Sequence, residues 1–342
     1  MRRRRPEAFW TDADPFARLV RGVLAPASAV YAGVTGARNA LYDARLLPVV
    51  QPAVPALSLG NLSVGGTGKT PMAAWAALQL RDRGGRPAIV LRGYGDDEPL
   101  VHARLAPEVP VIIAPDRVRG AEDAARQGAD CVVLDDAFQH RRIARVADWV
   151  LVAAEQWRDD AWRLPAGPLR EPARALRRAS LVVVTRKVAS LAQAESLAAR
   201  LATLVPGAAS AVVHLAPAAL RSLAGAVRPL SDLAGRRFLA VAAIGAPAPF
   251  FAQLRALGAD LDELPLADHH AFTDDDLRRI AARAVGTDGV VCTLKDAVKL
   301  APRGRGAMPP LWYVSQAVAV ERGGDRLDAS LGAVLAARVL PL

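Results

Sequence analysis

The sequence contains few cysteines and few aromatic residues. Only two of its 342 residues are cysteines, Cys131 and Cys292, and each lies in an apolar stretch far from the other. Such cysteines are typical of small buried side chains in a reducing compartment, and they exclude a disulfide framework. The five histidines show no His-Glu-x-x-His or Cys/His spacing, which argues against a structural zinc site.

Long apolar runs are also absent from the sequence. Four arginines stand at residues 2–5, but three acids follow at Glu7, Asp12 and Asp14, where the apolar core of a signal peptide would lie. The uncharged span 22–37 has 16 residues and contains Pro26, so it is too short to cross a bilayer. We therefore expect neither a cleaved signal nor a membrane-spanning helix.

The length and the charge set broad bounds on organisation and partners. A chain of 342 residues is expected to form about two domains of roughly 150 residues each. The net charge of +10 suits an anionic partner, although arginines spread over solvated surfaces would give the same excess. Nucleic acid is not expected, because no reader motif or stacking pattern of aromatic and basic residues accompanies the arginines. No obligate protein partner is expected either.

The strongest motif is a phosphate-loop pattern at residues 63–70, Ser-Val-Gly-Gly-Thr-Gly-Lys-Thr, in which Ser63 replaces the usual first glycine. An apolar run at 55–60 precedes it and a helical run at 72–80 follows it. Backbone N–H groups of such a loop surround an anion, the lysine reaches the β- and γ-phosphates, and the threonine hydroxyl ligates Mg²⁺. The predicted ATP-binding residues are Ser63, Gly65, Gly66, Thr67, Gly68, Lys69 and Thr70.

Short apolar runs alternate with helical stretches along the chain. Strands are expected at 86–91, 109–114, 131–134, 149–152 and 181–185. This alternation predicts an α/β fold like that of the P-loop NTPases, with a doubly wound, mainly parallel sheet. After a looser stretch at 215–219, a second α/β pattern has strands at 238–244, 289–293 and 311–314 and a helix at 249–257. We expect an N-terminal amphipathic segment (1–47), a phosphate-loop kinase domain (48–215) and a smaller C-terminal α/β domain (216–342).

Two groups of acidic residues directly follow predicted strands. Asp135 and Asp136 end the strand at 131–134, which is the Walker B arrangement of a Mg²⁺-holding carboxylate. Residues 96–98 are three successive acids, and phosphoryl transfer needs a carboxylate near the attacking hydroxyl. Position alone does not single out Asp97 among them. His140 either orients substrate or is a structural histidine.

The segment 15–47 alternates apolar and basic residues at helical spacing. A basic amphipathic helix on an anionic membrane surface has this pattern. An ordinary N-terminal helix packed on the core has it too, and the residues alone leave both open.

Taken together, the motifs resemble the tetraacyldisaccharide 4'-kinase family of lipid A biosynthesis. The resemblance rests on residues 60–71, 92–99, 116–117, 134–141 and 164–172, and then on 268–269 and 293–300. The N-terminal stretch that ends with residues 38–43 is similar too. The match thus runs in order from near residue 15 to beyond residue 300, which is more specific than any single motif.

The resemblance implies transfer of the ATP γ-phosphate to the 4'-hydroxyl of a tetraacylated glucosamine disaccharide 1-phosphate, which yields lipid IVA. It also implies a peripheral location on the cytoplasmic face of the bacterial inner membrane, with the N-terminal helix as the contact. The residue roles that it implies are Asp97 as base assisted by His269, Mg²⁺ near Thr70, Asp135 and Asp136, and a substrate- or phosphate-facing Arg117. From the motifs themselves we expect Lys69 to act at the phosphates and His140 to contact substrate.

The sequence departs from the family pattern at three points. The segment between Tyr94 and Asp97 is shorter than usual, which leaves open whether Asp96 or Asp97 is the equivalent acid. Ala137 replaces a glycine, and Leu294 stands where an acid is usual.

The alternative function is a nucleotide-switched P-loop NTPase that acts on a protein or metal-delivery client. A soluble small-molecule kinase is the nearest enzymatic alternative.

Overall fold

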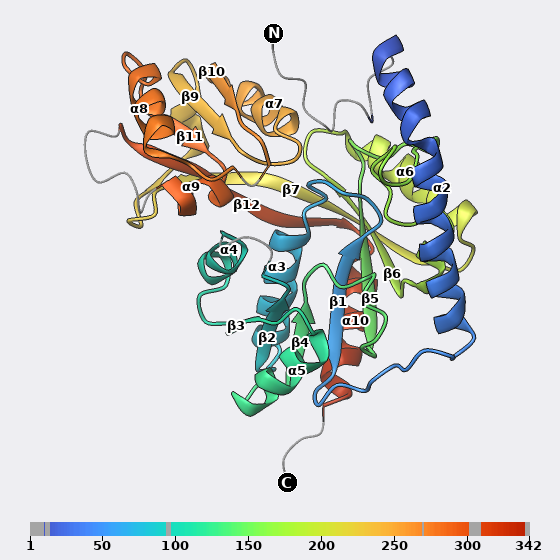
Figure 1. Ribbon diagram of the computed structural model, residues 1–342. Helices are drawn as coiled ribbons and strands as arrows, with labels where there is room; N and C mark the ends of the chain where they lie inside the picture. The colour runs from blue at the N-terminus through green and yellow to red at the C-terminus, as the bar shows by residue number, and fades with distance from the viewer. Residues whose placement is uncertain (1–9, 11–13, 94–96, 269, 301–308, 339–342) are drawn as a thin grey trace.

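The structure is a computed structural model that describes residues 10, 14–93, 97–268, 270–300 and 309–338 (Figure 1). Within these residues, twelve strands form one sheet. The strands are β1 (Ala56–Asn61), β2 (Pro87–Leu91), β3 (Val111–Ile113), β4 (Cys131–Leu134), β5 (Ala147–Ala153), β6 (Leu181–Arg186), β7 (Ala209–Arg221), β8 (Val227–Arg228), β9 (Arg237–Ala242), β10 (Asp260–Pro265), β11 (Val290–Cys292) and β12 (Leu311–Arg322).

The helices mostly connect successive strands. They are α2 (Pro15–Asp43), α3 (Lys69–Asp82), α4 (Asp97–Leu105), α5 (Arg117–Arg126), α6 (Leu191–Leu204), α7 (Ala248–Ala256), α8 (Asp274–Arg283), α9 (Leu294–Leu300) and α10 (Gly324–Ala336), with the 3₁₀ helices η1 (Ala173–Arg178) and η2 (Leu230–Leu233). Of these, α2 lies before the first strand and runs along the outside of the molecule (Figure 1). No helix in the described part of the chain combines the length and the apolar character needed to cross a membrane.

The sheet consists of two parallel parts joined by one antiparallel pair. Its order is β10-β9-β11-β12-β7-β6-β5-β1-β4-β2-β3, with β8 paired to β7. Strands β7 and β12 run antiparallel to each other, while the pairs on either side of them are parallel. In the larger part the carboxyl ends of β1, β2, β4 and β6 therefore reach the same edge of the sheet, which is where α/β proteins bind ligands.

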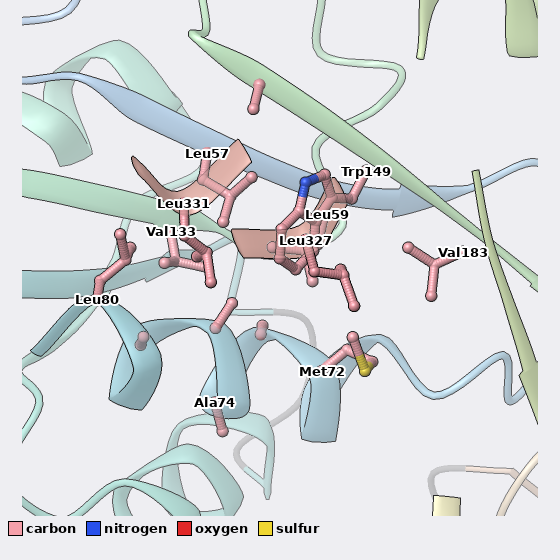
Figure 2. Packing of buried hydrophobic residues seen from close by; sticks show 14 of the residues in the cluster. Leu57, Leu59, Met72, Ala74, Leu80, Val133, Trp149, Val183, Leu327 and Leu331 are labelled. Carbon is pink, nitrogen blue, oxygen red and sulfur yellow. The ribbon is translucent and has the colours of Figure 1, made fainter. Parts of the chain in front are cut away.

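Helices cover both faces of the larger part. On one face α3 and α10 pack on the strands, with Met72, Leu80, Leu327 and Leu331 against residues such as Leu57 (Figure 2). On the other face lie α5 and α6. The strands are buried on both sides, which explains their continuous apolar sequences.

The elements expected from the sequence occur in the predicted order. The predicted boundary between residues 215 and 216 lies inside β7, so the two predicted domains share one sheet. The division of the chain into domains stays a prediction. The late strand expected at 311–314 continues as β12 to Arg322.

One glycine determines how closely β1 approaches the segment after β4. A Cβ atom built on Gly60 would lie 2.7 Å from the backbone nitrogen of Phe138, which is closer than any real Cβ contact. The amide N–H of Ala137 donates to the carbonyl of Leu59 at 3.0 Å, so the two backbones are bonded at this point. Gly60 therefore permits the segment after β4 to lie directly against the strand that leads into the phosphate loop.

We expect Gly60→Ala to lower the free energy of unfolding by about 1 to 3 kcal/mol, because the added methyl must push the two backbones apart. Urea denaturation measures this. Gly22→Ala is the control, since a Cβ at Gly22 in α2 has nothing within 4 Å and is expected to be neutral or stabilising by up to about 1 kcal/mol. Equal stability of Gly60→Ala and the wild type would contradict the close approach.

Candidate active site

The phosphate loop connects β1 to the N-terminus of α3. Gly65 and Gly68 have φ values of 126° and 88°, which other residues adopt only with strain. Gly68 is the N-cap of α3, and Lys69 and Thr70 begin that helix. The helix N-terminus and the turned loop bring backbone N–H groups and the positive end of the helix dipole to one place, which suits a phosphate.

Three side chains hold the phosphate loop in place. The Asn61 side-chain amide donates to the Thr67 hydroxyl at 3.0 Å, and the Thr185 hydroxyl donates to the Thr67 carbonyl at 2.8 Å. Lys187 follows β6 and donates from Nζ to the Gly66 carbonyl at 3.0 Å. Thr67 is buried, so both contacts are shielded from water. The loop is therefore fixed by β1 and β6 before any ligand binds.

Lys187 is a second cation at the loop that sequence reasoning missed. The Glu155 carboxylate accepts the backbone N–H groups of Lys187, Val188 and Ala189 and so fixes the segment that carries it. Burial lowers the pKa of Lys187, although Glu155 opposes the change. Its position just after a strand, in the same edge as the phosphate loop, is the only signal that the sequence offers.

Asp135 and Asp136 follow β4 at the same edge. Asp136 has a φ of 49°, an uncommon conformation for a residue other than glycine. One carboxylate oxygen of Asp136 lies 3.8 Å from Lys69 Nζ and 2.8 Å from Arg170 Nη1. Burial opposes ionisation of Asp136, but the charges of Lys69 and Arg170 outweigh it and lower the pKa. The structure thus brings together Lys69 and Asp136, two residues that the sequence analysis names at the phosphates and at Mg²⁺.

Asp135 is more buried than Asp136 and points elsewhere. Its Oδ2 lies 2.8 Å from Nε2 of His102 on α4, and both side chains are shielded from solvent. Its Oδ1 is buried and has no hydrogen-bond partner within the described residues. His102 is a residue of the site that sequence reasoning missed, because nothing in a single helical histidine indicates which strand end it faces.

Asp97 is the first residue of α4 and is only 3% exposed. Its Oδ2 lies 3.8 Å from Lys295 Nζ and 3.7 Å from Lys299 Nζ, both on α9. Lys295 also lies 3.5 Å from Asp268. These contacts join the helix after β2 to the C-terminal part of the sheet. Asp96, the other candidate for the base, and His269, which is expected to assist the base, lie outside the described residues.

Arg117 and His140 lie beside the two aspartates. The buried Arg117 guanidinium donates to the carbonyls of Ala114 at 2.9 Å and of Asp135 at 3.0 Å. The prediction that Arg117 faces substrate or phosphate stays a prediction. Nε2 of His140 has no hydrogen-bond partner in the described part of the chain, and burial followed by the charge of Arg117 lowers the pKa of His140. Its imidazole is therefore neutral near pH 7.

The structure shows the surroundings of Ala137 and Leu294, two residues at which the chain departs from the family pattern. Ala137 is fully buried and is not among the residues with positive φ, so its backbone does not require the glycine that it replaces. Leu294 begins α9 and is buried in the core of the C-terminal part. The effect of either residue on nucleotide contacts stays a prediction.

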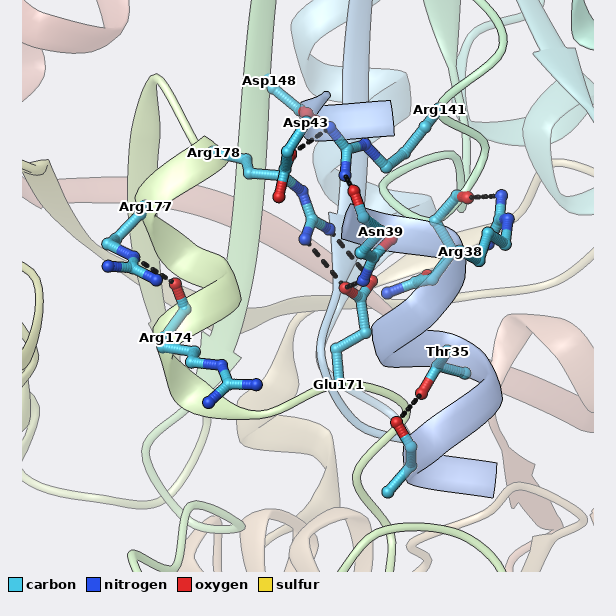
Figure 3. Close-up of polar contacts among 12 residues, drawn as sticks. Thr35, Arg38, Asn39, Asp43, Arg141, Asp148, Glu171, Arg174, Arg177 and Arg178 are labelled. Atoms are coloured by element: carbon cyan, nitrogen blue, oxygen red, sulfur yellow. Dashed lines mark hydrogen bonds and ion pairs between the residues drawn. The ribbon is translucent and has the colours of Figure 1, made fainter. Parts of the chain in front are cut away.

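A partly buried polar network connects α2 to the segment after the site. Glu171 accepts two hydrogen bonds from Arg178, at 2.8 and 3.0 Å, and one from the Asn39 amide at 2.6 Å (Figure 3). Arg141 donates to the Asn39 carbonyl at 2.9 Å and to Asp43 at 2.7 Å. The C-terminal half of α2 is thus bonded to the residues that follow Asp135 and Asp136.

The acidic residues suit a Mg²⁺ ion that is bound together with ATP phosphates, and not a metal ion that is held by protein side chains alone. No group of three or more histidine, cysteine or acidic side chains is placed to hold a metal within the described ranges. In kinases Mg²⁺ is bound by one or two carboxylates and by phosphate oxygens, so a complete protein cage is not needed. The free buried Oδ1 of Asp135, with Asp136 and the Thr70 hydroxyl at the start of α3, supplies oxygen donors of the required type.

Comparison with known proteins identifies the family. A family model described as "Tetraacyldisaccharide-1-P 4'-kinase" matches residues 20–97 and 95–336 of this chain. The chain belongs to this family. A "Tetraacyldisaccharide 4'-kinase" of Anaeromyxobacter sp. (strain K) is 40% identical over 98% of this chain and 97% of its own length. One of Syntrophus aciditrophicus is 37% identical over 87% of this chain and 88% of its own length.

A solved structure agrees with the sequence comparison. LpxK from Aquifex aeolicus, described as an "apo" form in complex with ATP, is 27% identical and matches with a TM-score of 0.71 over 92% of this chain and 99% of its own. The expected family resemblance and the P-loop NTPase-like, mainly parallel fold are therefore confirmed. Kinases that transfer phosphate to a hydroxyl make up this family, and a nucleotide-switched NTPase is not favoured.

Asp148 is a buried acid near the segment that follows Asp135 and Asp136, and its ionisation makes stability depend on pH. Its carboxylate lies 3.5 Å from Arg145, whose guanidinium also donates to the carbonyl of Ala137 at 2.9 Å. Burial raises the pKa of Asp148 to about 6, despite Arg145. In an unfolded chain the value is about 3.9. The stability from this group is thus present below about pH 4 and is lost as the pH rises through 6.

We expect Asp148→Asn to remove the dependence of stability on pH that comes from this carboxyl group. Relative to the wild type, its free energy of unfolding should rise by about 2 to 3 kcal/mol between pH 4 and pH 7.5, as measured by urea denaturation. Asp260→Asn removes the same charge from an exposed position on β10 and serves as the control. A constant difference between Asp148→Asn and the wild type across this range would refute the raised pKa.

Proposed function

We propose that this chain transfers the γ-phosphate of ATP to the 4'-hydroxyl of a tetraacylated glucosamine disaccharide 1-phosphate and so forms lipid IVA. The observation that carries the proposal is the meeting of Lys69 from the phosphate loop with Asp136 at the carboxyl edge of the sheet, 3.8 Å apart. Membership of the 4'-kinase family supports the acceptor, and the ATP complex of the Aquifex aeolicus relative supports the donor.

The phosphate loop is the proposed ATP site. Backbone N–H groups of the loop and of the α3 N-terminus surround the phosphates, and Lys69 neutralises charge at the β- and γ-phosphates. The residues proposed to contact ATP are Ser63, Gly65, Gly66, Thr67, Gly68, Lys69 and Thr70. Thr70, Asp135 and Asp136 would hold Mg²⁺, which would offset charge on the phosphate oxygens.

Asp97 is the proposed general base. It accepts the proton of the 4'-hydroxyl as the new O–P bond forms and the bond between the γ-phosphorus and the bridging oxygen breaks, releasing ADP. His269 assists it from the C-terminal part. Lys295 and Lys299 hold the carboxylate at a fixed position, since each lies within 4 Å of Asp97. Closure of the two parts around the substrate excludes water that would otherwise hydrolyse ATP.

Arg117 and His140 are proposed to act on the substrate side. The neutral His140 has a buried ring nitrogen without a partner in the described residues, which suits a hydrogen bond to a sugar hydroxyl. Arg117 faces substrate or phosphate in this proposal. In the structure described here it also holds the Asp135 carbonyl, so its loss would disturb the metal-binding segment as well.

The kinase reaction is tested with γ-labelled ATP, Mg²⁺ and the disaccharide 1-phosphate in detergent micelles. We expect labelled lipid from the wild type, and a kcat reduced about 100- to 10,000-fold in Asp97→Asn with ATP affinity changed by less than about threefold. Lys69→Ala should lose labelled lipid and weaken ATP binding. ATP turnover without labelled lipid would favour a switch NTPase, and full activity of Asp97→Asn would remove Asp97 as the base.

We propose further that α2 rests on the anionic cytoplasmic surface of the inner membrane. Its large exposed apolar residues occur at spacings of three, four and seven, so they form one stripe along the helix: Phe16, Leu19, Val23, Val30, Val34 and Leu41. The opposite side is bound to the protein, where the buried Ser28 hydroxyl donates to the Arg163 carbonyl at 2.9 Å and accepts from the Ala166 N–H at 2.9 Å.

This division of α2 into a docked side and an exposed apolar side favours an interfacial helix over a core helix. Arg18, Arg21, Arg38 and Arg45 lie on or just after the same helix and add attraction to anionic lipid. The acyl chains of the substrate would then enter the site from the membrane along α2.

We expect the double variant Val23→Glu, Val30→Glu to reduce binding to anionic phosphatidylglycerol vesicles by about tenfold or more, because two charges replace apolar contacts. Vesicle co-sedimentation measures this. Val285→Glu is the control, since Val285 is 80% exposed but lies outside α2. Unchanged vesicle binding of the double variant would refute the stripe as the membrane contact.

A further inference from the structure

The contact between His102 and Asp135 joins the helix of the proposed base to the proposed metal carboxylate. His102 lies in the last turn of α4, the helix that begins with Asp97. Its Nε2 is 2.8 Å from Asp135 Oδ2, and its side chain is fully buried. One short helix therefore carries both the acid proposed to take the proton and a side chain that bonds the Walker B segment.

The surroundings determine how the contact is made. An aspartate carboxylate offers only acceptors, so a hydrogen bond requires the proton on Nε2 of His102. Nδ1 of His102 is buried without a partner among the described residues. The contact with Asp135 therefore uses Nε2–H as the donor.

Asp135 is held at three points. Its N–H donates to the Val90 carbonyl at 2.9 Å, and its own carbonyl accepts from Arg117 at 3.0 Å. His102 fixes the carboxylate through Oδ2. The remaining oxygen, Oδ1, is buried and has no partner in the described part of the chain. The side chain thus has a single orientation that leaves one oxygen available.

We propose that His102 is a positioning residue that orients Asp135 so that Oδ1 is presented to the Mg²⁺ of the nucleotide complex, and that it couples this orientation to the position of α4. The proposal rests on the metal-binding role of Asp135 in the proposed function. Side chains that orient metal-binding carboxylates or imidazoles typically change metal affinity about 10- to 100-fold when removed. A leucine at position 102 would fill the space but leave the carboxylate free to turn.

The test measures metal and nucleotide binding by the full chain without the lipid acceptor. His102→Leu removes the donor, and His102→Gln keeps an N–H group at a similar reach. Val101→Ala is the matched control, because Val101 is the neighbouring buried residue of α4 and packs in the C-terminal core. The readouts are Mn²⁺ affinity at saturating ATP, from the EPR signal of free Mn²⁺, and ATP affinity in EDTA.

We expect His102→Leu to weaken Mn²⁺ binding about tenfold or more, and His102→Gln to restore it to within about threefold of the wild type. ATP affinity in EDTA should change by less than about twofold in both, and Val101→Ala should change neither quantity. Mn²⁺ affinity unchanged in His102→Leu, or lowered equally in Val101→Ala, would overturn the proposal.

If His102→Leu does not fold, His102→Gln and His102→Asn decide, because the shorter asparagine amide cannot reach Asp135. Equal Mn²⁺ affinity of these two variants would overturn the proposal. A wild type that binds Mn²⁺ and ATP but phosphorylates no disaccharide would refute the proposed kinase function and leave the positioning role intact. A wild type whose ATP affinity does not respond to Mn²⁺ would overturn the positioning role itself.

Discussion

Strand β1 passes so close to Phe138 that residue 60 has no room for a side chain. This contact places the segment after β4 beside the strand that enters the phosphate loop, and the rest of the site depends on it. Lys69 can reach Asp136 only because the two loops leave the sheet side by side. Asn61, the residue after Gly60, holds both segments. Its side-chain amide donates to the Thr67 hydroxyl, and its backbone carbonyl accepts the Gln139 side-chain N–H at 2.9 Å.

Each acid of the site is bonded to a different element. Asp135 bonds to α4, Asp136 to Arg170 and the phosphate loop, and Asp97 to two lysines of α9. Ion pairs that are partly buried contribute little net stability, because desolvation offsets the attraction between the charges. Their effect here is on orientation. A shift of α4 would move Asp97 and Asp135 together, so the proposed base and the proposed metal carboxylate are not positioned independently.

The sequence predicted those parts of the molecule that follow from local pattern. Continuous apolar runs give strands buried on both faces, and the glycines of residues 65–68 with Lys69 and Thr70 give a loop that surrounds phosphate. Segments that break such a pattern were harder to place. Pro217 and the alanines around it form the looser stretch at 215–219, and these residues continue β7, because β6 and β12 pair with β7 on its two sides. The polar residues Ser315 and Gln316 interrupt the apolar run of β12, so the strand was expected to end at residue 314, although it continues to Arg322.

The sequence by itself determined the family, the phosphate loop and the acids at the strand ends. Each of these features depends on short runs of neighbouring residues whose spacing matches one local geometry. Only the tertiary structure decided which side chains from distant segments meet them. Lys187, Arg170 and His102 lie 121, 34 and 33 residues from the groups that they bond, Gly66, Asp136 and Asp135. The order of strands in the sheet brings them together, and that order is set by the packing of the whole chain.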